Sequence, residues 1–91
     1  MYKGRRKIMK LEDTVSLMLS DDFKDKTKAE YLQLKIRHEK LANILKGYRE
    51  GTLDFKPNCD YGLLHTQLIY MEDYMNVLEE RAKIEDIDLG E

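Results

Sequence analysis

The stretch YLQLKIRHEKLANILKGY, residues 31–48, decides the fold. It has no proline and one glycine, and its mostly apolar and aromatic residues recur at intervals of three and four: Tyr31, Leu34, His38, Leu41, Leu45 and Tyr48. Residues with this spacing share one face of an α-helix. The stretch therefore predicts an amphipathic helix over about residues 22–46, with Gly47 as its left-handed stop.

Further along the chain, a second stretch repeats the same spacing and predicts a helix over residues 60–85, capped by Asn58 or Asp60. Its stripe consists of Leu64, Gln67, Met71, Tyr74, Leu78 and Arg81. The intervening residues 47–59 hold two glycines and the one proline, and so form a loop. Two matched stripes joined by one loop predict an antiparallel helical hairpin.

A short apolar segment, LEDTVSLML at residues 11–19, comes before the hairpin. Ser20, Asp21 and Asp22 follow it, and these residue types begin helices. We therefore predict an all-α fold, with a short helix at residues 11–18 followed by the hairpin, in one domain over residues 11–89. The final residues, IEDIDLGE, are expected to fray.

Self-association is expected from the small size of the chain. A domain of 91 residues has little core of its own. Leu32, Ile36, Leu68 and Met75 lie outside the main stripes. These residues predict a homo-oligomer, in which a second copy covers the second apolar stripe, with Ile36 and Met75 at its centre.

Charge is unevenly distributed. The whole chain has 16 Lys and Arg against 18 Asp and Glu, a net charge of −2. The first ten residues carry +5, so the other 81 carry −7, the difference between −2 and +5. We interpret residues 1–10 as a flexible basic arm, either a solvated end upstream of a start at Met9 or a contact for phosphates. The acidic body argues against a nucleic-acid partner.

The chain lacks the features of membrane and secreted proteins. No run approaches the roughly 18 apolar residues of a membrane span, and no apolar segment follows the basic start. The single cysteine, Cys59, cannot form an internal disulfide. These observations predict a cytoplasmic protein without a membrane partner.

No pattern in the chain is typical of a catalytic or metal site. Cys59, His38 and His65 have none of the spacings of zinc ligands, and a packed, hydrogen-bonded role is expected for His38. No nucleophile motif or glycine-rich phosphate loop is present. We therefore expect a protein that is not an enzyme and that uses no metal or cofactor.

The start of the long helix carries the candidate ligand site. Its lysines, next to aromatic residues, could bind phosphates at the positive end of the helix dipole, while an aromatic face stacks a base. The hairpin brings one arginine to the same end. The candidate residues are Phe23, Lys24, Lys26, Lys28, Tyr31 and Arg81. A structural alternative stays open, with the lysines solvated and paired to nearby acids and Tyr31 in the core.

Two stretches of the sequence carry a resemblance to a known family. The first is TVSLMLSDDFKDKTKAEYLQLKIRHEKL, residues 14–41, and the second is Leu63-Leu64-x-x-Gln67-x-x-x-Met71-x-x-Tyr74-x-x-x-Leu78-x-x-Arg81-Ala82. Over residues 14–89 the chain resembles the small helical proteins of gut phages and prophages known as crAss-phage-related proteins. Phe23 stands where that pattern has tyrosine, which keeps a stacking face but removes a hydroxyl. The resemblance implies a phage origin and a bacterial host cell.

The predicted architecture is also similar to phage sponge proteins that act against CBASS and Thoeris immunity. That resemblance implies a homo-oligomer that holds a cyclic oligonucleotide or a cyclic ADP-ribose type signal without cleaving it. The expected function is thus sequestration of a nucleotide second messenger. The alternative is a protein-binding inhibitor or assembly module, anti-CRISPR-like or antitoxin-like, that acts on a host defence protein.

Overall fold

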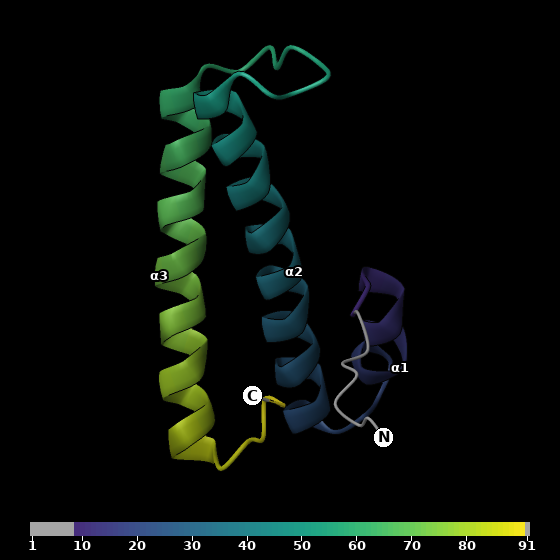
Figure 1. Cartoon of the computed structure of the whole chain (residues 1–91). Coiled ribbons are helices and arrows are strands. Elements are labelled where there is room, and N and C mark those ends of the chain that lie inside the picture. Colours follow the sequence, from purple (N-terminus) through teal and green to yellow (C-terminus); the bar gives the residue numbers. More distant parts are fainter. Residues whose placement is uncertain (1–8, 91) are drawn as a thin grey trace, which may run out of the picture.

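The computed structural model describes residues 9–90, and these residues form helices without any strand (Figure 1). A 3-10 turn, η1 (Leu11–Thr14), leads directly into the short helix α1 (Val15–Met18). The long helices α2 (Phe23–Glu50) and α3 (Tyr61–Glu85) follow. The predicted all-α fold, a short helix followed by a long hairpin, is confirmed. The predicted basic arm lies outside the described residues, apart from Met9 and Lys10.

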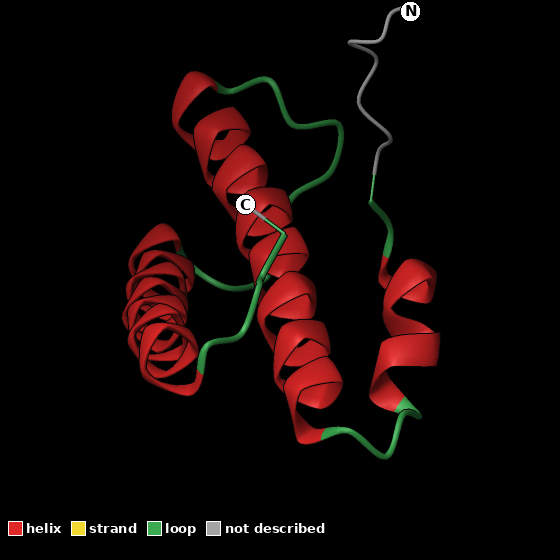
Figure 2. Cartoon of the chain, turned by 90° about the horizontal axis from the view of Figure 1, so that it is seen from below, coloured by secondary structure: helices red, strands yellow, loops and turns green. Residues whose placement is uncertain are grey.

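The helix α2 lies in the middle of the molecule. It packs against α3 on one side and against α1 on the other, as the view from below shows (Figure 2). A hydrogen bond of 2.9 Å from the Gln33 amide to the hydroxyl of the fully buried Thr14 fixes the end of η1, just before α1, to α2. One long helix therefore holds both of its neighbours.

Aspartate side chains begin both long helices. The Asp22 carboxylate accepts a 2.9 Å hydrogen bond from the backbone N–H of Lys24 at the start of α2. The Asp60 carboxylate accepts one of 2.9 Å from the N–H of Leu63 at the start of α3. Each bond satisfies a donor that a helix start leaves unpaired. Of the two predicted caps for α3, Asp60 is the one that acts.

The prediction that α2 stops at Gly47 is wrong. The helix continues to Glu50, and Gly51, with φ of 70°, takes the left-handed position after it. Gly47 stays helical and buried, because Leu53 folds back onto it from the loop. A Cβ at residue 47 would lie 2.8 Å from Leu53 Cδ2. A side chain at residue 47 would thus force the Leu53 side chain to shift, and the turn uses the next glycine, Gly51.

The core lies between α2 and α3. Its buried members are Tyr31, Leu34, Leu78, Ala82 and Leu89, with Leu32, Met71, Met75 and Ile87 packed against them. The α2 side agrees with the predicted stripe, since Tyr31, Leu34 and Leu45 are buried.

The predicted stripe of α3 is wrong in three of its six members. Gln67, Tyr74 and Arg81 are exposed, whereas Leu78 faces the core. The helix carries two neighbouring apolar faces, and the one without polar residues is turned inward. Leu78 and Ala82 on that face are buried, and the other members are half-buried: Leu64, Leu68, Met71 and Met75. Burying Gln67 and Arg81 would leave polar groups to satisfy, so α3 is rotated to leave them in water.

The packing of the hairpin corrects part of the predicted assembly surface. Leu32 and Met75, which we expected to face a second copy, pack against the core of the same chain. Ile36 and Leu68, the other two residues of that surface, are half-buried. The expected interface thus loses two of its four apolar residues to the core.

The C-terminal tail, expected to fray, folds back instead. The backbone N–H of Ile87 donates a 2.8 Å hydrogen bond to the carbonyl of Ala82, and Leu89 is buried in the core. The tail crosses toward the start of α2 and closes the open end of the hairpin (Figure 1). It thereby borders the lysines of the candidate site.

Candidate functional site

The lysine end of the molecule consists of Phe23, Lys24, Lys26 and Lys28, all in the first two turns of α2. The side chain of Phe23 is 47% exposed, so its ring is open to stacking. Lys24 and Lys26 are exposed and Lys28 is half-buried. These lysines are two residues apart, so their ammonium groups point in different directions around the first two turns of α2. The positive end of the helix dipole also favours an anion there, although the Asp22 carboxylate already accepts the N–H of Lys24.

Two of these lysines lie beside the C-terminal tail. Lys24 Nζ donates a 3.3 Å hydrogen bond to the carbonyl of Asp86. A Cβ built on Gly90 would lie 3.6 Å from Lys28 Cε. The tail therefore places both lysines, and their long stems can still turn their ammonium groups outward.

A shallow depression of about 380 Å³ lies next to these lysines. It is lined by the end of α3 and by the tail, namely Glu79, Ala82, Lys83, Asp86, Ile87, Asp88 and Leu89. The carboxylates in this lining repel phosphate. An anionic ligand at this end is therefore expected on the α2 side, over the lysines.

The structure places Tyr31 away from any ligand. Its side chain is 1% exposed, and its hydroxyl donates a 2.5 Å hydrogen bond to Glu79 Oε2. The ring is enclosed by the core and offers no free face for a base. Of the two aromatic candidates, only Phe23 is open.

Arg81 lies on a different face from the lysines. It is exposed one residue before the buried Ala82, seven residues after Tyr74. Two helical turns take seven residues, so Arg81 and Tyr74 lie above one another on the outer side of α3. The hairpin brings Arg81 to the predicted end of the molecule but not into the lysine cluster.

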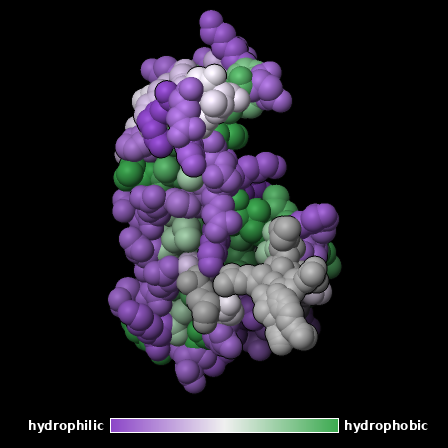
Figure 3. Space-filling view, in the orientation of Figure 1, coloured by the Kyte–Doolittle hydropathy of each residue, from purple (hydrophilic) through white to green (hydrophobic). Residues whose placement is uncertain are grey.

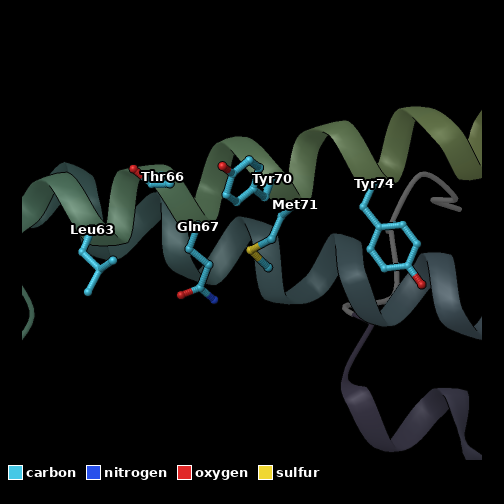
Figure 4. Close-up of a pocket in the computed structure, with 6 residues that line it drawn as sticks. All are labelled: Leu63, Thr66, Gln67, Tyr70, Met71 and Tyr74. Carbon is cyan, nitrogen blue, oxygen red and sulfur yellow. The ribbon is translucent and has the colours of Figure 1, made fainter.

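An open apolar groove of about 460 Å³ runs along α3 on the side where Met71 meets the core. It is lined by Leu63, Thr66, Gln67, Tyr70, Met71 and Tyr74 (Figure 4). Leu63, Gln67, Met71 and Tyr74 extend from the same side of the helix in the close-up. The sequence interpretation missed this groove. The spacing of seven residues between Leu63, Tyr70 and Val77, next to the predicted stripe of α3, could have indicated it.

Other apolar residues are exposed among polar ones. The space-filling view shows this for one face of the molecule (Figure 3). Exposed apolar residues scattered singly are normal on a protein surface. The residues along α3 differ, because they follow one another at helical spacing. They form a continuous face.

The seam histidine is hydrogen-bonded, as predicted. His38 Nε2 lies 2.9 Å from Glu72 Oε2, a contact between α2 and α3. Within residues 9–90, no group of three or more His, Cys, Asp or Glu residues is placed to hold a metal ion. Cys59 is exposed in the loop.

Aromatic contacts hold the opposite end of the hairpin. Tyr61 packs edge-to-face on Tyr48, with ring centroids 5.6 Å apart, and its hydroxyl accepts a 2.9 Å hydrogen bond from Arg49. That hydrogen bond raises the pKa of Arg49 above its ordinary value. The hydrogen bond from Arg49 to Tyr61 thus joins the end of α2 to the start of α3.

Among the described residues, neither long helix has a stretch apolar enough to cross a membrane.

Comparison with curated proteins and with solved structures finds no match. A family model with the description Sequestin matches residues 21–84, which is more than half of the chain. The match begins just before α2 and ends in the last turn of α3, so it spans the hairpin. The chain belongs to the Sequestin family.

Proposed function

We propose that this protein sequesters a small nucleotide second messenger, of the cyclic oligonucleotide or cyclic ADP-ribose type, without cleaving it. The observation that carries the proposal is the match to the Sequestin family, whose name describes a sequestering and hence binding role. The matched residues begin at Asp21 and so include Phe23 and all three lysines. In this proposal, the protein comes from a phage or prophage and acts against host immunity.

The lysine end supplies the chemistry that such a ligand requires. Lys24, Lys26 and Lys28 provide ammonium groups for phosphates, at the positive end of the α2 dipole. Base stacking on an aromatic side chain contributes about 1–3 kcal/mol, and Phe23 has the exposed ring for it. Arg81 is left out of this site because it lies on the other face of α3.

Sequestration needs only tight binding and enough protein. A binder in excess over its dissociation constant lowers the free concentration of the signal, and the effector of the host then stays below its threshold. Affinities near the micromolar range correspond to about −8 kcal/mol. Three charge contacts and one stacking contact reach this range more readily when the lysines are restricted before binding, and the tail restricts Lys24 through the hydrogen bond to the carbonyl of Asp86.

Titration calorimetry against cyclic di- and trinucleotides and cyclic ADP-ribose isomers tests the proposal. We expect one class to bind, and Lys24→Ala and Lys26→Ala each to weaken binding at least tenfold while the melting temperature holds. Lys46→Ala is the matched control, since Lys46 is an exposed lysine near the other end of the same helix. Absence of heat from every ligand at about 100 μM protein, well above a micromolar Kd, contradicts the proposal.

A second function is favoured by the exposed apolar face of α3. A host defence protein could dock on that face, which would make the chain a protein-binding inhibitor. The same lysine variants separate the two functions. Loss of immune evasion with Lys24→Ala supports nucleotide capture, whereas loss only with changes at Tyr70 or Tyr74 that leave the oligomeric state unchanged supports protein docking.

A further inference from the structure

The outer face of α3 carries an unbroken stripe that the fold of one chain leaves uncovered. We define this outer stripe by residues whose spacing alternates between four and three: Leu63, Gln67, Tyr70, Tyr74, Val77, Arg81 and Ile84. Its five apolar side chains are all well exposed, at 60% for Leu63, 68% for Tyr70, 44% for Tyr74, 56% for Val77 and 78% for Ile84. A strict alternation of three and four is the pattern by which helices pair side by side.

The exposed area is of the size that an interface needs. A large apolar side chain presents about 150–250 Å² when fully exposed, so these fractions amount to on the order of 600 Å². A standard interface covers about 800 Å² on each partner, and the flanking residues of α3 supply the remainder. Patches of this size on monomeric proteins commonly mark binding surfaces.

The order of residues in the stripe is the same from either end. It reads apolar, polar, three apolar, polar, apolar. Gln67 stands seven residues before Tyr74 and Arg81 seven residues after it. A two-fold axis near Tyr74 would therefore bring apolar residues onto apolar ones and polar residues onto polar ones.

We infer that the outer stripe binds a second copy of this chain, with the two α3 helices antiparallel around a two-fold axis near Tyr74. Such an interface uses the same patch on both copies, which requires this self-complementary order. Val77 then faces Tyr70 of the other copy, and Leu63 faces Ile84. This surface differs from the expected one around Ile36 and Met75, of which Met75 packs against the core.

The two polar members of the stripe fit the same arrangement. Gln67 of one copy comes opposite Arg81 of the other, on both sides of the axis. The guanidinium has five N–H donors and the amide oxygen can accept from them. Polar pairs of this kind within an apolar interface fix register and orientation.

The inference stands apart from the proposed ligand. The outer stripe belongs to α3, whereas the lysine end belongs to α2. A dimer could form without any nucleotide, and a nucleotide could bind to a chain that does not dimerise. The two experiments therefore fail independently.

Sedimentation equilibrium from about 1 to 200 μM tests the interface on the full chain without ligand. We expect a dimer for the parent and at least a tenfold rise in the dimer dissociation constant for Val77→Glu. Ile69→Glu is the matched control, because Ile69 is 40% exposed on the same helix but lies about 100° around it from Tyr70. Circular dichroism verifies that both variants fold. A monomeric parent, or equal effects of the two variants, overturns the inference.

Charge exchange and cross-linking test the register. Gln67→Lys should weaken the dimer at least tenfold by opposing Arg81, and adding Arg81→Glu should restore it. In a Cys59→Ser background, Tyr74→Cys should cross-link to its own copy with bismaleimidoethane, and Ile69→Cys should not. Failure of the charge rescue, or equal cross-linking at the two positions, means that the helices meet in another way and overturns the two-fold arrangement.

Discussion

At the residue scale, the hydroxyl of Tyr31 ties α2 to α3 through its 2.5 Å hydrogen bond to Glu79. We predict that Tyr31→Phe lowers the free energy of unfolding by about 1–3 kcal/mol, because a hydrogen bond to a charged group is lost. Urea denaturation measures this loss. Tyr70→Phe, which removes an exposed hydroxyl, should stay within about 0.5 kcal/mol of the parent. Equal stabilities for parent and Tyr31→Phe would contradict the structural role of Tyr31.

At the element scale, the C-terminal tail acts as part of the core, because Leu89 packs with Tyr31 and Leu78. We predict that Leu89→Ala costs about 2–5 kcal/mol of stability through lost burial and a residual cavity. Leu19→Ala, at a leucine that is 76% exposed, is the matched control and should cost little. Thermal unfolding compares them. A Leu89→Ala protein as stable as the control would show that the tail contributes nothing.

The local features of these elements could be predicted from the sequence. The caps at Asp22 and Asp60, the hairpin and the buried Tyr31 stripe follow from short-range spacing and from side chains that satisfy helix ends. The predictions that were wrong, the end of α2 and the fraying of the tail, concern features that depend on contacts between residues far apart in the sequence. Leu53 folds onto Gly47, and Leu89 reaches the core from beyond α3.

The prediction of which face of α3 meets α2 was wrong for a related reason. Two apolar faces adjoin on this helix, and spacing alone does not tell which one meets α2. The candidate site was predictable in part, since the helix start places the lysines and Phe23. The spacing placed Tyr31 on the inner stripe, but its hydrogen bond to Glu79 and the position of Arg81 on an exposed face depend on how α2 and α3 pack, which only the folded chain shows.

At the scale of the whole molecule, the protein is a helical hairpin with two separate surfaces: a basic, aromatic end on α2 and an exposed, mostly apolar stripe on α3. The first surface would hold a nucleotide and the second would join two copies. Neither use requires bond cleavage. The protein would act by concentration and affinity alone.

The central claim, capture without cleavage, is tested most directly by recovery of the ligand. The protein is saturated with the cyclic nucleotide that binds in calorimetry, freed of excess ligand by gel filtration and then heat-denatured, and the released nucleotide is identified by mass spectrometry. The account predicts that the nucleotide co-elutes with the protein in stoichiometric amount and is released intact and still cyclic. A linearised product, or no nucleotide in the protein fraction, would contradict it.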